Sequence, residues 1–290
     1  MALVSIVPLL REAQAGRYAL PLFLTPEMLA AEGTVAALED LRAPAAVGVY
    51  AAWIERPDAR AFSAFLRALA EEASVPIALM LDHGANLEQC IRAIRYGYTD
   101  VMYDGSALPL AENIATTRTI VQAAHAVGVG VEAELGHVGS GSDYAAYGAQ
   151  RAGFTEPGTV APFVEATGVD VLAVAFGSAH GVYQGEPRLD LALLGQLRAA
   201  TGIPLAMHGG SGLSREQFQG AIATGISKIN VFTELGLTAG QRLCAHAAGG
   251  QASYFSFQDV VRGTFRERCA DYLTMFGAAG QAAAAPEGAS

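Results

Sequence analysis

Eight short apolar runs alternate along the chain with amphipathic, Ala-rich stretches, and this alternation constrains the fold more than any other feature. Runs of this kind bounded by turn residues are typical of strands, and helical stretches between them favour parallel pairing. Near-continuous apolar character indicates strands buried on both faces. The expected strands cover residues 18–23, 45–50, 76–81, 100–103, 130–135, 169–176, 203–207 and 227–232.

Eight strands separated by helices predict an α/β fold, a (β/α)8 TIM barrel with additional C-terminal helices. A single domain over residues 1–290 suits that fold. A doubly wound open sheet is the alternative, but it would not explain polar groups at the ends of so many different strands. Asn86 is a candidate helix N-cap, and Ser214 and Gln217 have capping-box spacing. The expected helices between the strands cover 59–73, 87–96, 111–127, 155–166, 191–200 and 214–223.

Two segments interrupt the alternation. Residues 136–154 form a long stretch rich in Gly, Ala, Ser and Tyr, and a loop of that length is usually functional, so we expect a lid. Beyond the last strand a helical extension is expected over 233–276, with a turn at Gly249-Gly250. The Ala/Gly-rich tail, 277–290, is expected to be flexible.

Composition excludes several classes of protein. The net charge of −10 argues against binding to nucleic acid or to an anionic membrane surface. No run is long enough to span a bilayer, and the apolar N-terminus lacks the features of a signal peptide, so a cytoplasmic location is expected. The three cysteines are far apart in sequence, which favours small buried residues over a disulfide or a metal site.

Three of the six histidines share one context: His83, His180 and His208 each lie at or beyond the end of an apolar run, and each precedes a glycine. In a barrel the carboxyl ends of the strands meet at one face, so these imidazoles can converge on one ion. Three imidazole ligands with an open position are typical of catalytic Zn²⁺ or a similar divalent ion. A satisfied polar residue at the barrel mouth is the alternative for any one histidine, but less so for all three.

Acidic residues accompany the histidines. Asp82 directly precedes His83 and could carry a proton, and Asp104 and Glu134 end the fourth and fifth strands. Glu132 lies on the same side of its strand as Glu134. Buried carboxylates need a cation, which could be the metal, a second ion or Lys228, the only lysine in the chain. For Glu132, an ion pair that orients the histidines is an equally good interpretation.

Glycine-rich turns after the seventh and eighth strands predict a phosphate site. Gly209, Gly210 and Ser211 follow the seventh strand, and Asn230 and Thr233 follow the eighth. Backbone N–H groups in such turns bind anions, and this is the usual phosphate position of the barrel fold. The residues therefore predict metal-assisted chemistry on a small phosphorylated substrate. Aldol cleavage, isomerisation and epimerisation all fit that description.

Together these motifs resemble the class II, metal-dependent fructose- and tagatose-bisphosphate aldolases, over residues 75–235. The resemblance implies a zinc held by His83, His180 and His208, and Asp82 as the acid/base for the C4 hydroxyl or aldehyde oxygen. The matching segments are Leu81-Asp82-His83-Gly84, Asp104-Gly105-Ser106, Glu132-Ala133-Glu134-Leu135-Gly136, Ala179-His180-Gly181, His208-Gly209-Gly210-Ser211-Gly212 and Lys228-Ile229-Asn230-Val231.

The same resemblance extends the list of candidate groups. Asp104 and Glu134 would lie at a nearby second-ion position. Gly181, Gly209, Ser211, Asn230 and Thr233 would hold the phosphate of a dihydroxyacetone-phosphate-like half, with a monovalent cation near Gly181. Members of this family form dimers or tetramers, so a homo-oligomer is expected.

The chain departs from the family pattern at the acceptor side. The family's lid glutamate, which takes the proton from the ketose phosphate, is replaced by Ser142, so Asp143, Tyr144 or Tyr147 is a candidate base. Other departures are Met80 for a histidine, 22–24 (Leu-Phe-Leu) for Ala-Phe-Asn, Tyr50 for a serine, and 253–255 (Ser-Tyr-Phe) for the Asp-Pro-Arg that reaches the distal phosphate.

These departures predict a zinc-dependent aldolase that makes or cleaves a C–C bond through the enediolate of a ketose phosphate, with an acceptor that is not a bisphosphate half. A metal-dependent sugar-phosphate isomerase or epimerase is one alternative. A non-catalytic phosphate-binding descendant is another, although retention of Asp82 argues against it. A Schiff-base mechanism would have to use Lys228.

Overall fold

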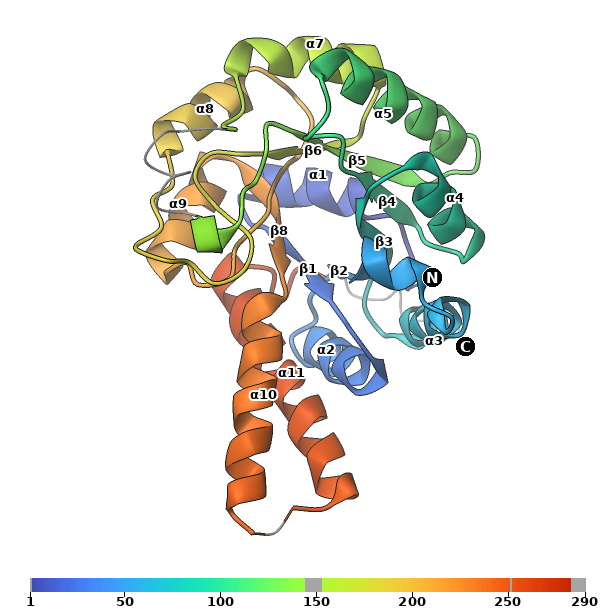
Figure 1. Cartoon of the computed structure of the whole chain (residues 1–290), viewed down its shortest axis with the longest axis vertical. Coiled ribbons are helices and arrows are strands. Elements are labelled where there is room, and N and C mark those ends of the chain that lie inside the picture. Colours follow the sequence, from blue (N-terminus) through green and yellow to red (C-terminus); the bar gives the residue numbers. More distant parts are fainter. Residues whose placement is uncertain (1, 144–152, 251, 283–290) are drawn as a thin grey trace.

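The computed structural model describes residues 2–143, 153–250 and 252–282. Eight parallel strands close into a barrel in sequence order, with β8 paired to β1 (Figure 1). The predicted (β/α)8 fold is confirmed, and each strand overlaps its predicted range. The strands are β1 (Leu20–Leu24), β2 (Ala45–Tyr50), β3 (Ile77–Gly84), β4 (Asp100–Tyr103), β5 (Gly130–Leu135), β6 (Val171–Val174), β7 (Leu205–Met207) and β8 (Ile226–Val231).

A helix follows every strand; those after β1 to β7 cover the outside of the barrel, and the one after β8 extends away from it (Figure 1). Asn86 caps α4 by accepting from the Gln89 N–H, and Ser214 and Gln217 form the predicted capping box of α9. The helices that follow β1 to β8 are α2 (Met28–Asp40), α3 (Ala59–Glu72), α4 (Leu87–Arg95), α5 (Leu110–His125), α7 (Pro157–Thr167), α8 (Leu191–Ala199), α9 (Arg215–Thr224) and α10 (Thr233–Ala248). Short 3-10 helices, η1 (Ala51–Glu55) and η2 (Gly141–Asp143), follow β2 and β5.

Two helices near the N-terminus lie outside the predicted ranges. One is α2, and the other is α1 (Ile6–Gly16), which precedes the barrel. The buried Asp100 carboxylate at the start of β4 accepts hydrogen bonds from the Ile6 N–H at 2.9 Å and the Ser5 hydroxyl at 2.7 Å. These bonds fix the start of α1 against the N-terminal ends of the strands, opposite the face where the histidines lie.

The C-terminal extension is a helical hairpin, as predicted for residues 233–276. It comprises α10 and α11 (Tyr254–Phe276), and its tip projects away from the barrel (Figure 1). The chain then stays attached to the end of α2, because Gly280 N donates to Leu41 O and Ala282 N donates to Arg42 O. Residues 278–282 are therefore anchored, although flexibility was expected from Gly277, and residues 283–290 lie outside the described part of the chain.

Of the predicted lid, the structure describes residues 136–143 and 153–154. Ser140 forms an isolated bridge with His180, and His137 N donates to Gly153 O at 2.7 Å. Both ends of the segment are thus attached near the carboxyl ends of β5 and β6. Within the described ranges, no helix combines the length and the apolar character that crossing a bilayer requires.

Close packing of α2 against α11 gives the first prediction. A Cβ atom on Gly33 would lie 2.3 Å from the carbonyl oxygen of Arg262, whereas a Cβ on Gly263 in α11 would meet nothing within 4 Å. Gly33→Ala should lower the free energy of unfolding by about 1–3 kcal/mol, because the two backbones must separate. Gly263→Ala should raise it by about 0.5–1 kcal/mol, because alanine favours the helix. Chemical denaturation of both variants tests this, and equal effects would contradict the close contact.

Candidate metal centre and substrate cavity

A β-bulge in β3 brings Asp82 and His83 to the same cavity. Adjacent residues of a regular strand point to opposite faces, so both could not otherwise reach the barrel mouth. The register between β3 and β4 shifts between Leu81 and Gly84, and His83 has a φ of 52°, a left-handed conformation that non-glycine residues rarely adopt. Both side chains line a cavity of about 530 Å³ at the carboxyl ends of the strands. The left-handed backbone conformation of His83 thus goes together with the position of its side chain in the cavity.

His83, His180 and His208 converge as the sequence predicts. The ring centroids are 4.7 Å apart for His83 and His208, 4.8 Å for His83 and His180, and 6.0 Å for His180 and His208. One nitrogen from each ring lies within 4.8 Å of the others, so the three could hold a single ion. Nε2 of His180 is buried and has no hydrogen-bond partner among the described residues. A buried nitrogen of that kind is costly unless it binds something.

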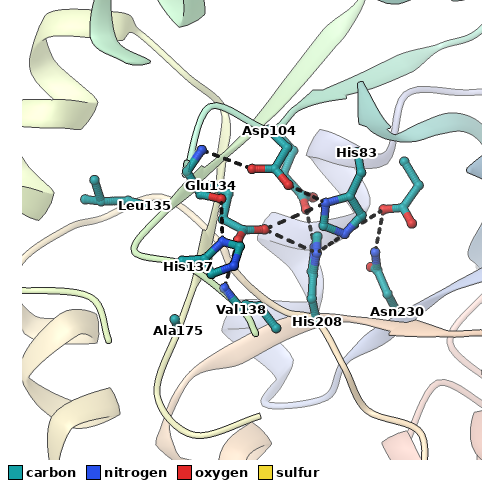
Figure 2. Close-up of polar contacts among 12 residues, drawn as sticks. His83, Asp104, Glu134, Leu135, His137, Val138, Ala175, His208 and Asn230 are labelled. Carbon is teal, nitrogen blue, oxygen red and sulfur yellow. Dashed lines mark hydrogen bonds and ion pairs between the residues drawn. The ribbon is translucent and has the colours of Figure 1, made fainter. Parts of the chain in front are cut away.

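Carboxylates fix the second nitrogen of two of these rings (Figure 2). His83 Nδ1 lies 2.8 Å from Asp104 Oδ2, and His208 Nε2 lies 2.8 Å from Glu132 Oε1. An ionised carboxylate only accepts hydrogen bonds, so these two ring nitrogens are the donors. That choice leaves His83 Nε2 and His208 Nδ1 directed at each other, 2.9 Å apart. Two lone pairs at that distance require a proton or a cation beside them, as expected at a metal site.

The electrostatics of the three rings also suit a cation. Burial and the neighbouring charge of His83 lower the pKa of His180 to about 4, and burial holds the pKa of His208 well below its ordinary value. Both rings are therefore neutral and able to act as ligands at pH 7. Burial opposes the charge on His83, but Asp82 and Asp104 outweigh it and raise its pKa to about 9. The carboxylates thus create a negative potential among the three rings.

A second group of potential ligands lies beside the first. His83, Asp104 and Glu134 also place one ligand atom each within 4.8 Å of one another. Burial and the charge of Asp104 raise the pKa of Glu134 to about 8, and its buried Oε2 has no hydrogen-bond partner among the described residues. Its other oxygen accepts from the Val138 N–H at 3.1 Å. This geometry is compatible with the predicted second-ion position, and that role stays a prediction.

Buried contacts of Lys228 connect His208 to Asp82, through Glu132 on one side and Asn230 on the other. Its ammonium group lies 3.0 and 2.9 Å from the two oxygens of Glu132 and donates to Asn230 Oδ1 at 2.6 Å. The Asn230 amide in turn donates to Asp82 Oδ1 at 2.7 Å. Lys228 is fully buried, and the described lining of the cavity contains no lysine. The structure thus favours the interpretation of Glu132 as part of an orienting ion pair, and it gives a Schiff-base role of Lys228 no geometric support.

The predicted phosphate residues all line the cavity. Gly181 and Gly209 have φ values of 84° and 72°, and a Cβ on Gly209 would lie 2.2 Å from the carbonyl oxygen of Ala179. These two positions therefore require glycine. Thr233 begins α10, whose N-terminus is a favourable place for an anion. The phosphate-binding role of the set stays a prediction for Gly181, Gly209, Gly210, Ser211, Asn230 and Thr233.

Only one of the three predicted replacements for the lid base, Asp143, lies within the described residues. Tyr144 and Tyr147 lie outside the described residues. Asp143 ends η2, and its role as an acid or base stays a prediction. Ser142 is exposed, and its hydroxyl pairs with that of Ser140 at 2.7 Å, so it brings no titratable group to the site.

Three features of the site were not predicted from the sequence. The Tyr183 hydroxyl accepts from Ala179 N at 2.8 Å and donates to Gly209 O at 2.6 Å, so it joins the loops that carry His180 and His208. Its position three residues after His180 was the only available signal. Ser106 binds Asp104 through its N–H, and an apolar wall, described below, lines the side of the cavity nearest β1 and β2.

The buried ion pair gives the second prediction. Lys228→Met should lower the free energy of unfolding by about 3–5 kcal/mol, because it leaves the Glu132 carboxylate buried without a cation. The double variant Lys228→Met/Glu132→Leu should recover most of that loss, because no charge then remains. Denaturation of the metal-free proteins measures both effects. A single variant as stable as the original chain would contradict the pairing.

Comparison with known proteins agrees with the geometry. A model of the family described as fructose-bisphosphate aldolase class-II matches residues 4–281. A fructose-bisphosphate aldolase of Geobacillus stearothermophilus is 41% identical over 242 residues, which cover 81% of this chain and 82% of that one. YdjI of Escherichia coli (strain K12) is 35% identical over 252 residues, which cover 86% and 88% of the two chains.

The crystal structure of the YdjI aldolase from Escherichia coli K12 superposes with a TM-score of 0.87 at 32% sequence identity, and the match covers 97% of this chain and 100% of that one. With the eight-stranded barrel and the three converging histidines, these matches establish that the chain belongs to the class II fructose-bisphosphate aldolases, a family of metal-dependent carbon–carbon lyases.

Proposed function

We propose that the protein is a zinc-dependent aldolase that acts on a ketose phosphate through its enediolate and uses an aldehyde without a phosphate group as acceptor. The observation that carries this proposal is the convergence of three imidazoles within 4.8 Å of one another, two of which, His83 and His180, line the same cavity as Asp82. Three nitrogen ligands suit Zn²⁺ better than Mg²⁺ or Ca²⁺, which prefer oxygen.

His83, His180 and His208 would hold the ion, and when bound it would supply Lewis-acid stabilisation of charge at the ketone oxygen. Asp82 handles the proton of the acceptor half. In cleavage the C4 hydroxyl gives its proton to the Asp82 carboxylate, the C3–C4 bond breaks, and the electron pair remains on the ketose half as the enediolate. Asn230 keeps the Asp82 carboxylate in place. The glycine-rich loops after β7 and β8 would bind the phosphate of the ketose half.

The wall of the cavity on the β1 and β2 side supports an uncharged acceptor. It consists of Leu24, Tyr50, Trp53 and Phe232, and the Trp53 and Phe232 rings pack edge to face with centroids 5.4 Å apart. None of the described residues that line the cavity is an arginine or lysine. A phosphate at this end would therefore lose water without gaining a cationic partner there.

The position of Asp82 indicates which side the acceptor occupies. Asp82 pairs in register with Tyr50 of β2, so the strand next to it on the side away from β4 carries the aromatic wall. If Asp82 handles the C4 hydroxyl, the carbons beyond C4 extend toward Tyr50 and Trp53. The segment in which the family carries its distal phosphate ligand offers no charged group there: it holds Tyr254 and Phe255, which begin α11 and are 71% and 74% exposed.

The metal and the reaction are tested together. We expect about one zinc per chain by elemental analysis and cleavage of ketose 1-phosphates in preference to fructose 1,6-bisphosphate and tagatose 1,6-bisphosphate. His180→Ala should lose the zinc, since it removes one of the three imidazoles that would hold the ion. Zinc without cleavage, but with interconversion of isomeric sugar phosphates, would support the isomerase alternative. Zinc without any turnover would support a binding protein, and absence of metal would overturn the proposal.

The aromatic wall gives a prediction about specificity. Trp53→Arg should raise the ratio of kcat/KM for glyceraldehyde 3-phosphate over glyceraldehyde by roughly tenfold or more, because the guanidinium supplies a charged partner for the phosphate. Trp53→Leu is the matched control, since it removes the ring without adding charge and should leave the ratio low. Condensation with dihydroxyacetone phosphate measures both. Preference of the original chain for the phosphorylated aldehyde would contradict the proposed acceptor.

A further inference from the structure

His137 lies in the cavity on the side of β5, opposite the acceptor wall. It follows Glu134 by three residues on the loop that begins the predicted lid, and its side chain is exposed at the cavity rim. Figure 2 shows its ring beside Glu134 and Val138, in the same cluster as His83 and His208. Its backbone N–H donates to Gly153 O at 2.7 Å, which fixes the loop at this point. The imidazole is thus both accessible to a ligand and attached to an ordered part of the chain.

A second residue orients the His137 ring. Nδ1 lies 3.1 Å from the Ser106 hydroxyl, and the Ser106 N–H donates to Asp104 Oδ1 at 3.0 Å. Asp104 is itself bound to His83. The ring is therefore held relative to the metal histidines by a short series of hydrogen bonds. A base oriented by another group in this way is a general feature of proton-transfer sites.

The other titratable groups that line the described part of the cavity already have roles. His83 and His180 are candidate metal ligands, Asp104 orients His83, and Asp82 belongs to the acceptor half. Tyr50 lies on the opposite side, in the acceptor wall. Only His137 then remains in the described lining to exchange a proton with the ketose half, since Ser142 stands at the position where the family carries its base.

Resting on the proposed function, we propose that His137 is the catalytic base that removes the proton from the carbon next to the ketone. In condensation the C–H bond breaks, the proton moves to Nε2 of His137, and the electron pair stays on the substrate as the enediolate. That pair then attacks the aldehyde carbon, and Asp82 gives a proton to the resulting alkoxide. In cleavage, after the aldehyde leaves, Nε2 returns a proton to the enediolate carbon. Each step balances without a further reactant.

Proton exchange without acceptor isolates this step. The zinc-loaded protein is incubated with dihydroxyacetone phosphate in D₂O, and NMR follows the loss of the carbon-bound proton. His137→Gln should slow exchange by roughly a hundredfold or more. Zinc content and the dissociation constant for dihydroxyacetone phosphate should stay as in the original chain. The matched control is His125→Gln on α5, whose ring pairs with Asp170 and does not line the cavity, and it should exchange normally.

A rescue variant separates a catalytic role from a structural one. Adding Ser142→Glu to His137→Gln restores a carboxylate at the family's position and should recover a large part of the exchange rate. Normal exchange in His137→Gln, or its loss together with the zinc or the ketone phosphate, would overturn the assignment. So would abolition by Asp143→Asn with His137→Gln unaffected. Absence of exchange in the original zinc protein would overturn the proposed function and this inference with it.

Discussion

The site depends on one buried ion pair, between Lys228 of β8 and Glu132 of β5. A lysine without any exposure is costly unless its charge is matched, and here both carboxylate oxygens lie within 3.0 Å of the ammonium group. Each member of the pair also contacts a second residue of the site. Glu132 binds Nε2 of His208 and so leaves Nδ1 directed at His83, and Lys228 binds Oδ1 of the Asn230 amide so that its N–H group meets Asp82. One pair thus sets the geometry of a candidate metal ligand, His208, and of the Asp82 carboxylate together.

The barrel could be predicted because each parallel strand buried on both faces is encoded by a nearly continuous apolar run, and the sequence contains eight such runs. The two missed helices lack a comparable local signal. The start of α1 is fixed by Asp100, some ninety residues away in sequence. In α2, residues that point in different directions are buried together because α11 covers one side and the barrel the other, so its apolar face has no clear period.

Within the site, residue identity was predictable and residue orientation was not. The shared context of the three histidines indicated a metal centre. The bulge that turns His83 could not be inferred, because it depends on the register of β3 against β4. The contacts of Tyr183 and Ser106 could not be inferred either, since they join loops that only the closed barrel brings together. His137 follows Glu134 closely enough in the sequence to line the site, but it had no strong claim to a role on the sequence alone.

The rim of the barrel divides into two sectors, which differ in whether they carry the candidate metal ligands and their hydrogen-bond partners. The hydrogen-bond partners of His83, His208 and Asp82 come from β3, β4, β5, β7 and β8, or from the turns that follow these strands. Leu24, Tyr50 and Trp53 belong to β1, β2 and η1 and are outside that network. Substitutions at Leu24 or Trp53 would therefore change the wall of the cavity without removing a hydrogen bond of the candidate metal ligands, whereas the Tyr50 ring also lies beside that of His83, with centroids 6.3 Å apart. The proposed base is separable in the same way, because His137 lines the cavity from the loop after β5, at a different backbone position than Ser142.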